Sequence, residues 1–139
     1  MKRILFAILG ILMISGITAC NKANEEKEEE ESFDLTATAW ADTGGTLSIV
    51  FLANNGISMT TSKDGYIFVQ GIRSIEGNTV TATFTDRQDG MDTGGIKTLD
   101  TPLVVTFSFN LSKDHKTATI PGGLSFLGYN SSISLERVR

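Results

Sequence analysis

Near its middle the chain reads Thr79-Val80-Thr81-Ala82-Thr83-Phe84-Thr85, and this strict alternation of threonine with apolar residues decides the fold class. Successive side chains of a β-strand point to opposite faces of the sheet, so the pattern predicts a strand with one buried face and one solvent-facing face. The range 103–109 repeats the alternation. Residues 33–139 show no convincing amphipathic helix, and an all-β domain is therefore expected.

Shorter runs of the same period flank this stretch on both sides, and turn residues separate them. These runs lie at 33–39, 47–53, 57–59, 66–73, 118–120 and 133–137. Asn54-Asn55-Gly56 supplies a hairpin turn, because Asn and Gly tolerate the positive φ that tight hairpins need. We expect an antiparallel meander of about eight strands, either a small up-and-down barrel or a two-sheet sandwich, which periodicity alone does not separate.

The first 19 residues have the organisation of a secretory leader. Lys2 and Arg3 give a basic start, an apolar run over 4–14 is interrupted only by Gly10, and small residues follow. This apolar run is shorter than the roughly 20 residues that a membrane-spanning helix requires. A signal peptide over 1–19 is therefore predicted, with a retained transmembrane helix as the alternative.

The leader ends in Ile17-Thr18-Ala19-Cys20, which resembles the lipobox of bacterial lipoproteins. The resemblance implies cleavage between Ala19 and Cys20, a diacylglycerol on the Cys20 thiol and acylation of the new amino terminus, for example with palmitate. Two or three acyl chains hold a protein stably on a membrane where one does not. A plain signal peptide with an unpaired thiol is the alternative. Since Cys20 is the single cysteine, no disulfide can form within the chain.

Residues 20–32 follow the cleavage site and read as an acidic flexible tether. The range 21–32 contains six Glu and two Lys and no large apolar side chain, so it cannot offset the entropy cost of ordering. A transient helix and a partner-binding acidic tail are the alternatives. The tract is similar to the acidic signal of surface lipoproteins of Bacteroidetes, which implies a lipid-anchored protein of the outer membrane, either periplasmic or surface-exposed.

The remaining range, 33–139, has the length of one compact domain. Its eight Lys and Arg against ten Asp and Glu leave no basic stripe, which argues against nucleic acid as a partner. Trp40 near the first strand, the Gly-rich hairpins and the final strand 132–138 are similar to the small lipocalin-like lipoproteins of Bacteroidetes. That resemblance implies a barrel with an apolar interior pocket and no catalytic residues. A short chain can instead fill its barrel with its own side chains.

Two copies of one motif, Asp42-Thr43-Gly44-Gly45 and Asp92-Thr93-Gly94-Gly95, are the sharpest candidates for chemistry. Asp-Thr-Gly resembles the catalytic loop of aspartic proteases, in which two carboxylates share a proton. Phe126-Leu127-Gly128 resembles the supporting element of that family. Such an enzyme would be a homodimer with one Asp42 per chain. In the alternative interpretation, which we favour, the motif is turn chemistry.

Other polar candidates are weaker. Asp86, Asp89 and Asp92 offer oxygen ligands for calcium, although their spacing departs from calcium-loop patterns and suits turns equally well. His115, the single histidine, is expected in a solvated turn because a zinc site needs further His or Cys ligands.

Aromatic side chains are expected in the core, although Trp40, Tyr66 and Tyr129 also have the polar groups that line ligand pockets. The phenylalanines expected in the core are Phe51, Phe68, Phe84, Phe107, Phe109 and Phe126. The sequence thus predicts a non-enzymatic domain without cofactors, anchored to the membrane through lipid on Cys20. Its ligand would be a small apolar molecule or a protein partner.

Overall fold

The computed structural model of the chain describes residues 33–91 and 94–139. The predicted leader (1–19), tether (20–32) and the pair Asp92-Thr93 lie outside these residues. Residues from Asp34 to Arg139 form one compact unit. Among the described residues, no helix has the length and apolar character needed to cross a membrane.

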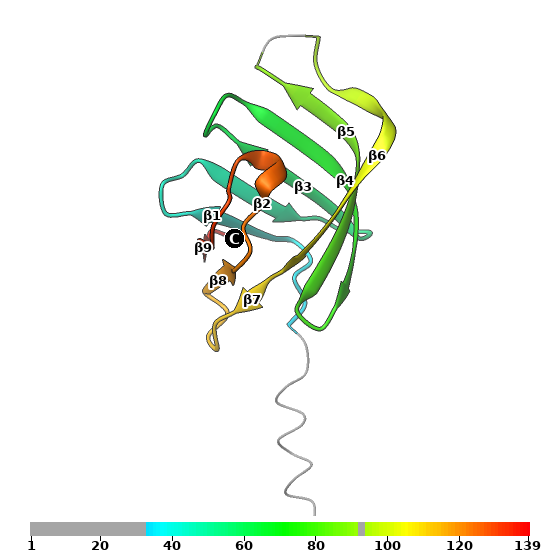
Figure 1. Cartoon of the computed structure of the whole chain (residues 1–139). Helices are drawn as coiled ribbons and strands as arrows, with labels where there is room; N and C mark the ends of the chain where they lie inside the picture. Colours follow the sequence, from blue (N-terminus) through cyan, green and yellow to red (C-terminus); the bar gives the residue numbers. More distant parts are fainter. Residues whose placement is uncertain (1–32, 92–93) are drawn as a thin grey trace, which may run out of the picture. The chain divides into compact units, whose positions relative to one another are not determined.

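Nine strands of this unit form a single antiparallel sheet, which confirms the predicted all-β meander and excludes a two-sheet sandwich. The strands lie in the order β6-β5-β4-β3-β2-β1-β9-β8-β7, and the sheet curls into a half-barrel (Figure 1). Their bounds are β1 Thr38–Asp42, β2 Leu47–Phe51, β3 Gly56–Thr61, β4 Ile67–Glu76, β5 Thr79–Asp89, β6 Lys97–Ser108, β7 Asn110–Leu111, β8 Thr117–Ile120 and β9 Ile133–Arg137. One short 3-10 helix, η1 (Ser125–Leu127), lies between β8 and β9.

The sheet bends where two register shifts interrupt the long strands. The β4–β5 ladder shifts between Gln70 and Gly71, and the β5–β6 ladder shifts after Phe84. Irregularities of this kind bend a strand and increase its local twist. A Cβ atom on Gly71 would lie 1.9 Å from the carbonyl oxygen of Thr83, so β5 can approach β4 this closely only at a glycine.

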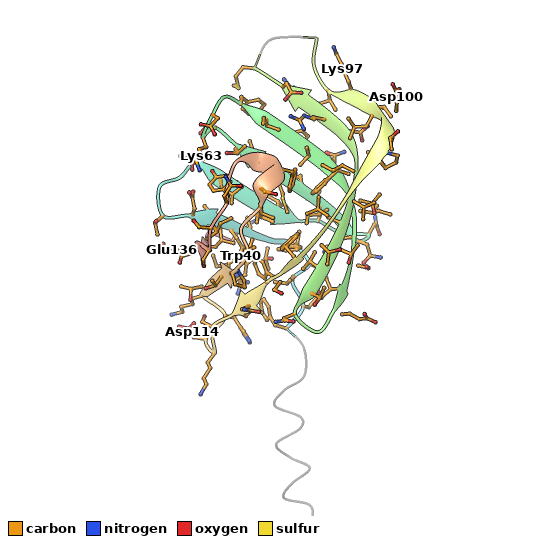
Figure 2. The ribbon with its side chains drawn as sticks, viewed as in Figure 1. Trp40, Lys63, Lys97, Asp100, Asp114 and Glu136 are labelled. Carbon is orange, nitrogen blue, oxygen red and sulfur yellow. The ribbon has the colours of Figure 1, made fainter. Side chains whose placement is uncertain are left out.

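The concave face of the sheet holds the core. Val80, Ala82 and Phe84 are fully buried there, whereas the threonines between them are half-buried on the convex face, as their alternation predicts. Phe109 packs edge-on against the rings of Trp40 and Phe51, with ring centroids 5.2 Å apart in both pairs. Figure 2 shows Trp40 within the half-barrel and labelled charged residues such as Asp114 at its periphery.

The observed strand bounds correct two expectations. The first strand begins at Thr38 rather than at Phe33, because Ala37 has a left-handed φ of 66° and the preceding residues form a turn. The sixth strand begins at Lys97 rather than at Leu103. The two-residue strand β7 raises the count to nine.

Phe109 lies at the point where the chain leaves one edge of the sheet and joins the other. Ser108 ends the edge strand β6, and Asn110 begins the opposite edge strand β7. The Phe109 N–H still donates to the carbonyl oxygen of Asn78, at 2.7 Å, so β6 remains attached to the β4–β5 hairpin up to this residue. We call the gap between the two edges of the sheet, β6 on one side and β7 and β8 on the other, the seam. The chain itself bridges the seam at Phe109, and among the described strands no ladder joins the two edges.

We predict that Phe84→Ala lowers the free energy of unfolding by about 3–5 kcal/mol, because it removes a fully buried ring and leaves a cavity. Thr83→Ala is the matched control, since the neighbouring side chain lies on the convex face. Denaturant unfolding of both variants measures the difference. Equal stability of the two variants would contradict the assignment of the concave face as the core.

Candidate functional site

An uncharged hollow of mixed polar and apolar lining lies along the open seam, between the carboxyl-terminal half of β6 and the segment that follows β8. Its volume is about 780 Å³. The lining residues are Thr79, Leu103, Val104, Val105, Thr106, Phe107, Ser108, Gly122, Gly123, Leu124, Ser125 and Phe126. We call this surface the seam groove. None of these residues is ionisable, so the groove has no charged group with which to select a charged ligand.

One wall of the seam groove is the segment 122–126, which is held by backbone contacts. Pro121 follows the end of β8, and Gly123 adopts a φ of 73° that suits glycine. A Cβ atom on Gly123 would lie 2.4 Å from the carbonyl oxygen of Tyr129, so the chain is tightly folded back here. The Phe126 ring then reaches the concave face, where its centroid lies 5.7 Å from that of Phe84.

The other wall is the free edge of β6. In an antiparallel ladder, alternate residues direct both their N–H and C=O groups to the same neighbouring strand. Because Phe109 bonds towards the β4–β5 hairpin and the β5–β6 register is unbroken from Leu103 to Ser108, residues 103, 105 and 107 share that direction. Val104, Thr106 and Ser108 therefore direct their backbone groups into the seam, where β6 has no strand partner among the described strands.

Protection of this edge is confined to its amino-terminal half. Four residues, 99–102, separate the two parts of the β5–β6 ladder, and they include Pro102. An interruption of the ladder by extra residues, like a β-bulge, and a proline both prevent another strand from pairing with an edge. Beyond Pro102 the edge has neither a charge nor a proline, and the Val104 side chain is 61% exposed. The stretch 103–108 therefore has neither charge nor proline to prevent strand pairing, and the segment 122–126 faces it across the seam groove.

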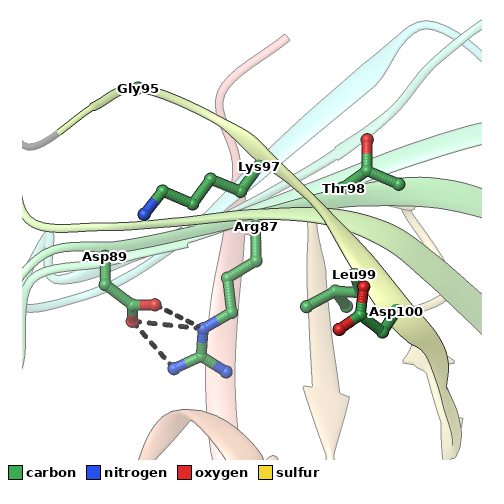
Figure 3. Close-up of a pocket in the computed structure, with 7 residues that line it drawn as sticks. All are labelled: Arg87, Asp89, Gly95, Lys97, Thr98, Leu99 and Asp100. Atoms are coloured by element: carbon green, nitrogen blue, oxygen red, sulfur yellow. Dashed lines mark hydrogen bonds and ion pairs between the residues drawn. The ribbon is translucent and has the colours of Figure 1, made fainter.

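A charged group of residues lies at the amino-terminal end of β6 (Figure 3). The Arg87 guanidinium donates to both carboxylate oxygens of Asp89, at 2.8–3.1 Å, and these hydrogen bonds lower the pKa of Asp89 and raise that of Arg87. Lys97 and Asp100 line the same hollow of about 380 Å³. The Arg87–Asp89 ion pair therefore engages two of the charged groups of this hollow with each other.

The predicted calcium ligands are divided between several roles. Asp86 accepts a hydrogen bond from the Thr98 hydroxyl at 3.0 Å, and Asp89 is paired with Arg87. Asp92 lies outside the described residues. Within 33–91 and 94–139, no cluster of three His, Cys, Asp or Glu residues is arranged to hold a metal ion.

Asp42 closes the turn between β1 and β2. Its carboxylate accepts hydrogen bonds from the Thr46 N–H, the Thr46 hydroxyl and the Leu47 N–H, at 2.8–2.9 Å. The Thr46 hydroxyl also lies 2.8 Å from the hydroxyl of Tyr129, which in turn lies 2.9 Å from that of Thr61. This network joins the turn to neighbouring strands, and it accounts for the copy of the motif at 42–45 by the turn chemistry that we favour. The second copy begins at Asp92 and Thr93, outside the described residues.

The structure places the single histidine, the two tyrosines and the tryptophan that the sequence singled out. His115 lies in the turn after β7, with a φ of 60°, and its N–H donates to the carbonyl oxygen of Ser112. Tyr129 and Tyr66 are half-buried, and the ammonium of Lys63 lies 4.7 Å from the centre of the Tyr129 ring. Trp40 is fully buried, and its indole N–H donates to the Thr38 hydroxyl.

The six phenylalanines expected in the core differ in burial. Phe51, Phe84, Phe107 and Phe109 are buried, while Phe68 and Phe126 are half-buried. Phe126 is half-buried because it lines the seam groove. Sequence reasoning places this ring in the core and misses the groove, whose two walls are 14 or more residues apart in the chain.

Arg73 is a charged residue in the core that the sequence does not single out. It is 7% exposed, its guanidinium lies 5.4 Å from the centre of the Phe51 ring, and it donates to the Thr36 hydroxyl at 3.2 Å. Burial lowers the pKa of Arg73, and the nearby Asp34 carboxylate opposes that shift. Arg73 thereby connects β4 with the segment that enters β1.

Comparisons with protein-family models, with curated proteins and with solved structures gave no match to this chain.

We predict that Asp42→Ala destabilises the domain by about 1–3 kcal/mol, because three donors around the β1–β2 turn lose their acceptor. Asp100→Ala is the control, since Asp100 is an exposed carboxylate on β6. Its effect should stay within about 0.5 kcal/mol. Denaturant unfolding checks both values. Wild-type stability of Asp42→Ala would show that the carboxylate is not a structural part of the turn.

Proposed function

We propose that this chain is a lipid-anchored lipoprotein of the bacterial envelope, held on the outer membrane through lipid on Cys20. The domain from 33 to 139 is displayed on the tether 20–32 for non-enzymatic binding of a protein partner. The partner binds at the seam groove. The leader would thus anchor the protein in the envelope, and the seam groove would bind its partner there.

One observation carries the choice of a protein partner over a small apolar ligand. The concave face is filled by the domain's own side chains, and Trp40, Phe51 and Met59 have no exposed surface. A carrier of small apolar molecules needs an enclosed pocket with an apolar lining. The uncharged hollow of the seam groove lies instead at the surface, beside backbone groups of β6 that have no strand partner among the described strands.

Those backbone groups favour an extended polypeptide as the occupant. When a strand is added to an exposed sheet edge, main-chain hydrogen bonds supply affinity and side-chain pockets supply specificity. Val104 and Thr106 offer the donors and acceptors, and Leu124 and Phe126 form the apolar wall opposite them. A small apolar molecule would leave the backbone groups of the edge unsatisfied.

The rival function is a dimeric aspartic protease that uses Asp42. The hydrogen bonds to the Asp42 carboxylate argue against it, because backbone N–H donors hold that group in a turn. A catalytic pair requires two carboxylates that share one proton. Pepstatin-sensitive peptide cleavage that is lost in Asp42→Asn would favour the rival.

We predict that Cys20→Ser abolishes the incorporation of labelled fatty acid and releases the protein from the membrane fraction. The physical reason is that loss of two or three acyl chains removes about 0.8 kcal/mol for each buried methylene. Asn21→Ser, a change of the adjacent residue, should keep both label and membrane association. Retention of the unlabelled Cys20→Ser protein on the membrane would contradict the lipid anchor.

We predict that a photoreactive benzoylphenylalanine at Val104 forms protein adducts in living cells, because this side chain borders the seam groove. The same probe at Ile72 is the control. Ile72 is 59% exposed and lies on the convex face of β4, two strands from the edge. Irradiation followed by immunoblotting compares the two. Absence of adducts at Val104, or equal adducts at both positions, would contradict binding at the seam groove.

A further inference from the structure

We infer that the partner at the seam groove is a second copy of this chain, which pairs its β6 edge antiparallel to the same edge across a two-fold axis at Thr106. This inference rests on the proposed binding of a protein at the seam groove and names the partner. It follows from the direction of the backbone groups, the lack of charge and the length of the free edge.

The free edge is complementary to itself. Val104, Thr106 and Ser108 direct their N–H and C=O groups into the seam, at alternate positions of one unbroken stretch. With the axis at Thr106, this residue faces its own copy, and Val104 of each chain faces Ser108 of the other. Each of these pairs exchanges two hydrogen bonds. The pairing therefore uses every outward backbone group of the three residues, as an isologous interface requires.

The charges of the chain favour this occupant over its other segments. Residues 101–112 contain no ionisable side chain, and neither does the lining of the seam groove. Two copies of β6 consequently meet without like-charge repulsion. The tether 20–32, with its six Glu, would lose the hydration of several carboxylates and gain no cation in the groove.

The stretch of β6 that lacks protective residues covers the same residues that would pair in the dimer. Pro102 precedes it, and Phe109 turns the chain away towards β7 after it. Val104, Val105, Thr106 and Phe107 have the β-branched and aromatic side chains that favour strands. Natural edges of this composition usually carry a charge or proline that prevents pairing. Here no charged residue and no proline follows Pro102 within β6, so the self-complementary stretch 103–108 has neither of these barriers to pairing.

Membrane anchoring would strengthen the pairing. Two chains held on one membrane have a raised effective concentration, which adds to a pairing that the β6 edge itself supports in detergent. The flexible tether proposed for 20–32 leaves each domain free to turn its β6 edge towards the other.

Cysteine cross-linking of the full chain in intact membranes tests this register. A residue facing its own copy in a hydrogen-bonded pair has a Cα–Cα distance of about 5.5 Å, within the range of a disulfide. We expect Thr106→Cys to give a disulfide-linked dimer under mild oxidation. Val104→Cys alone should give none, because its like positions would be offset by four residues, about 14 Å along the strand. Val104→Cys mixed with Ser108→Cys should restore the dimer.

The pattern of cross-links distinguishes a second copy from a different protein at the seam groove. Wild-type protein, whose single cysteine is Cys20, gives the background. No Thr106→Cys dimer, or equal dimer from Thr106→Cys and Val104→Cys, would overturn the pairing. If hetero-adducts at Val104 persist in that case, a protein still binds at the seam groove, and the second copy alone is rejected.

A second measurement does not depend on cysteine chemistry. In detergent, sedimentation of the full chain should show twice the monomer mass, and Thr106→Lys should halve it, because two ammonium groups would meet at the axis. Ser74→Lys is the matched control. Ser74 lies in the same row of the convex face, on β4, and should leave the mass doubled. Monomeric wild-type protein, or equal masses for the two variants, would overturn the inference.

Discussion

The structure depends on the burial of Phe109 between Trp40 and Phe51. Its ring is in edge-on contact with both, and its N–H holds β6 against the β4–β5 hairpin until the chain crosses to β7. The same stretch of chain therefore ends one edge of the sheet and begins the other. The chain connects the two edges of the half-barrel at Phe109. The edges stay unpaired along the preceding residues 103–108 of β6, where the seam groove lies.

Much of the fold could be predicted from local pattern. The alternation over 79–85 identifies β5 and its buried face, and Asn54 and Asn55 take the positive φ expected of a hairpin turn. Two features could not be read in this way. Ala37 has a left-handed conformation that no alanine predicts, and it delays the first strand to Thr38. Gly71 marks a bend because of the nearby Thr83 carbonyl, a contact that depends on register between strands.

The site was less accessible to sequence reasoning than the fold. The turn role favoured for Asp42 agrees with its hydrogen bonds to Thr46 and Leu47, because such a role depends on neighbours in the chain. The seam groove combines β6 with 122–126, and its character depends on which edge of β6 lacks a partner. Periodicity shows which side chains share a face, but the direction of backbone groups follows from the strand order. The uncharged stretch 101–112 was the one sequence signal that could have indicated it.

The central claim is that the backbone groups of Val104, Thr106 and Ser108 point into an open seam. Residue-resolved hydrogen exchange of the Thr106→Lys chain, which we expect to be monomeric, tests it most directly. The account predicts fast exchange at 104, 106 and 108 and slow exchange at 103, 105 and 107, since only the second set bonds to β5. Uniform protection along 103–108 would contradict an open seam.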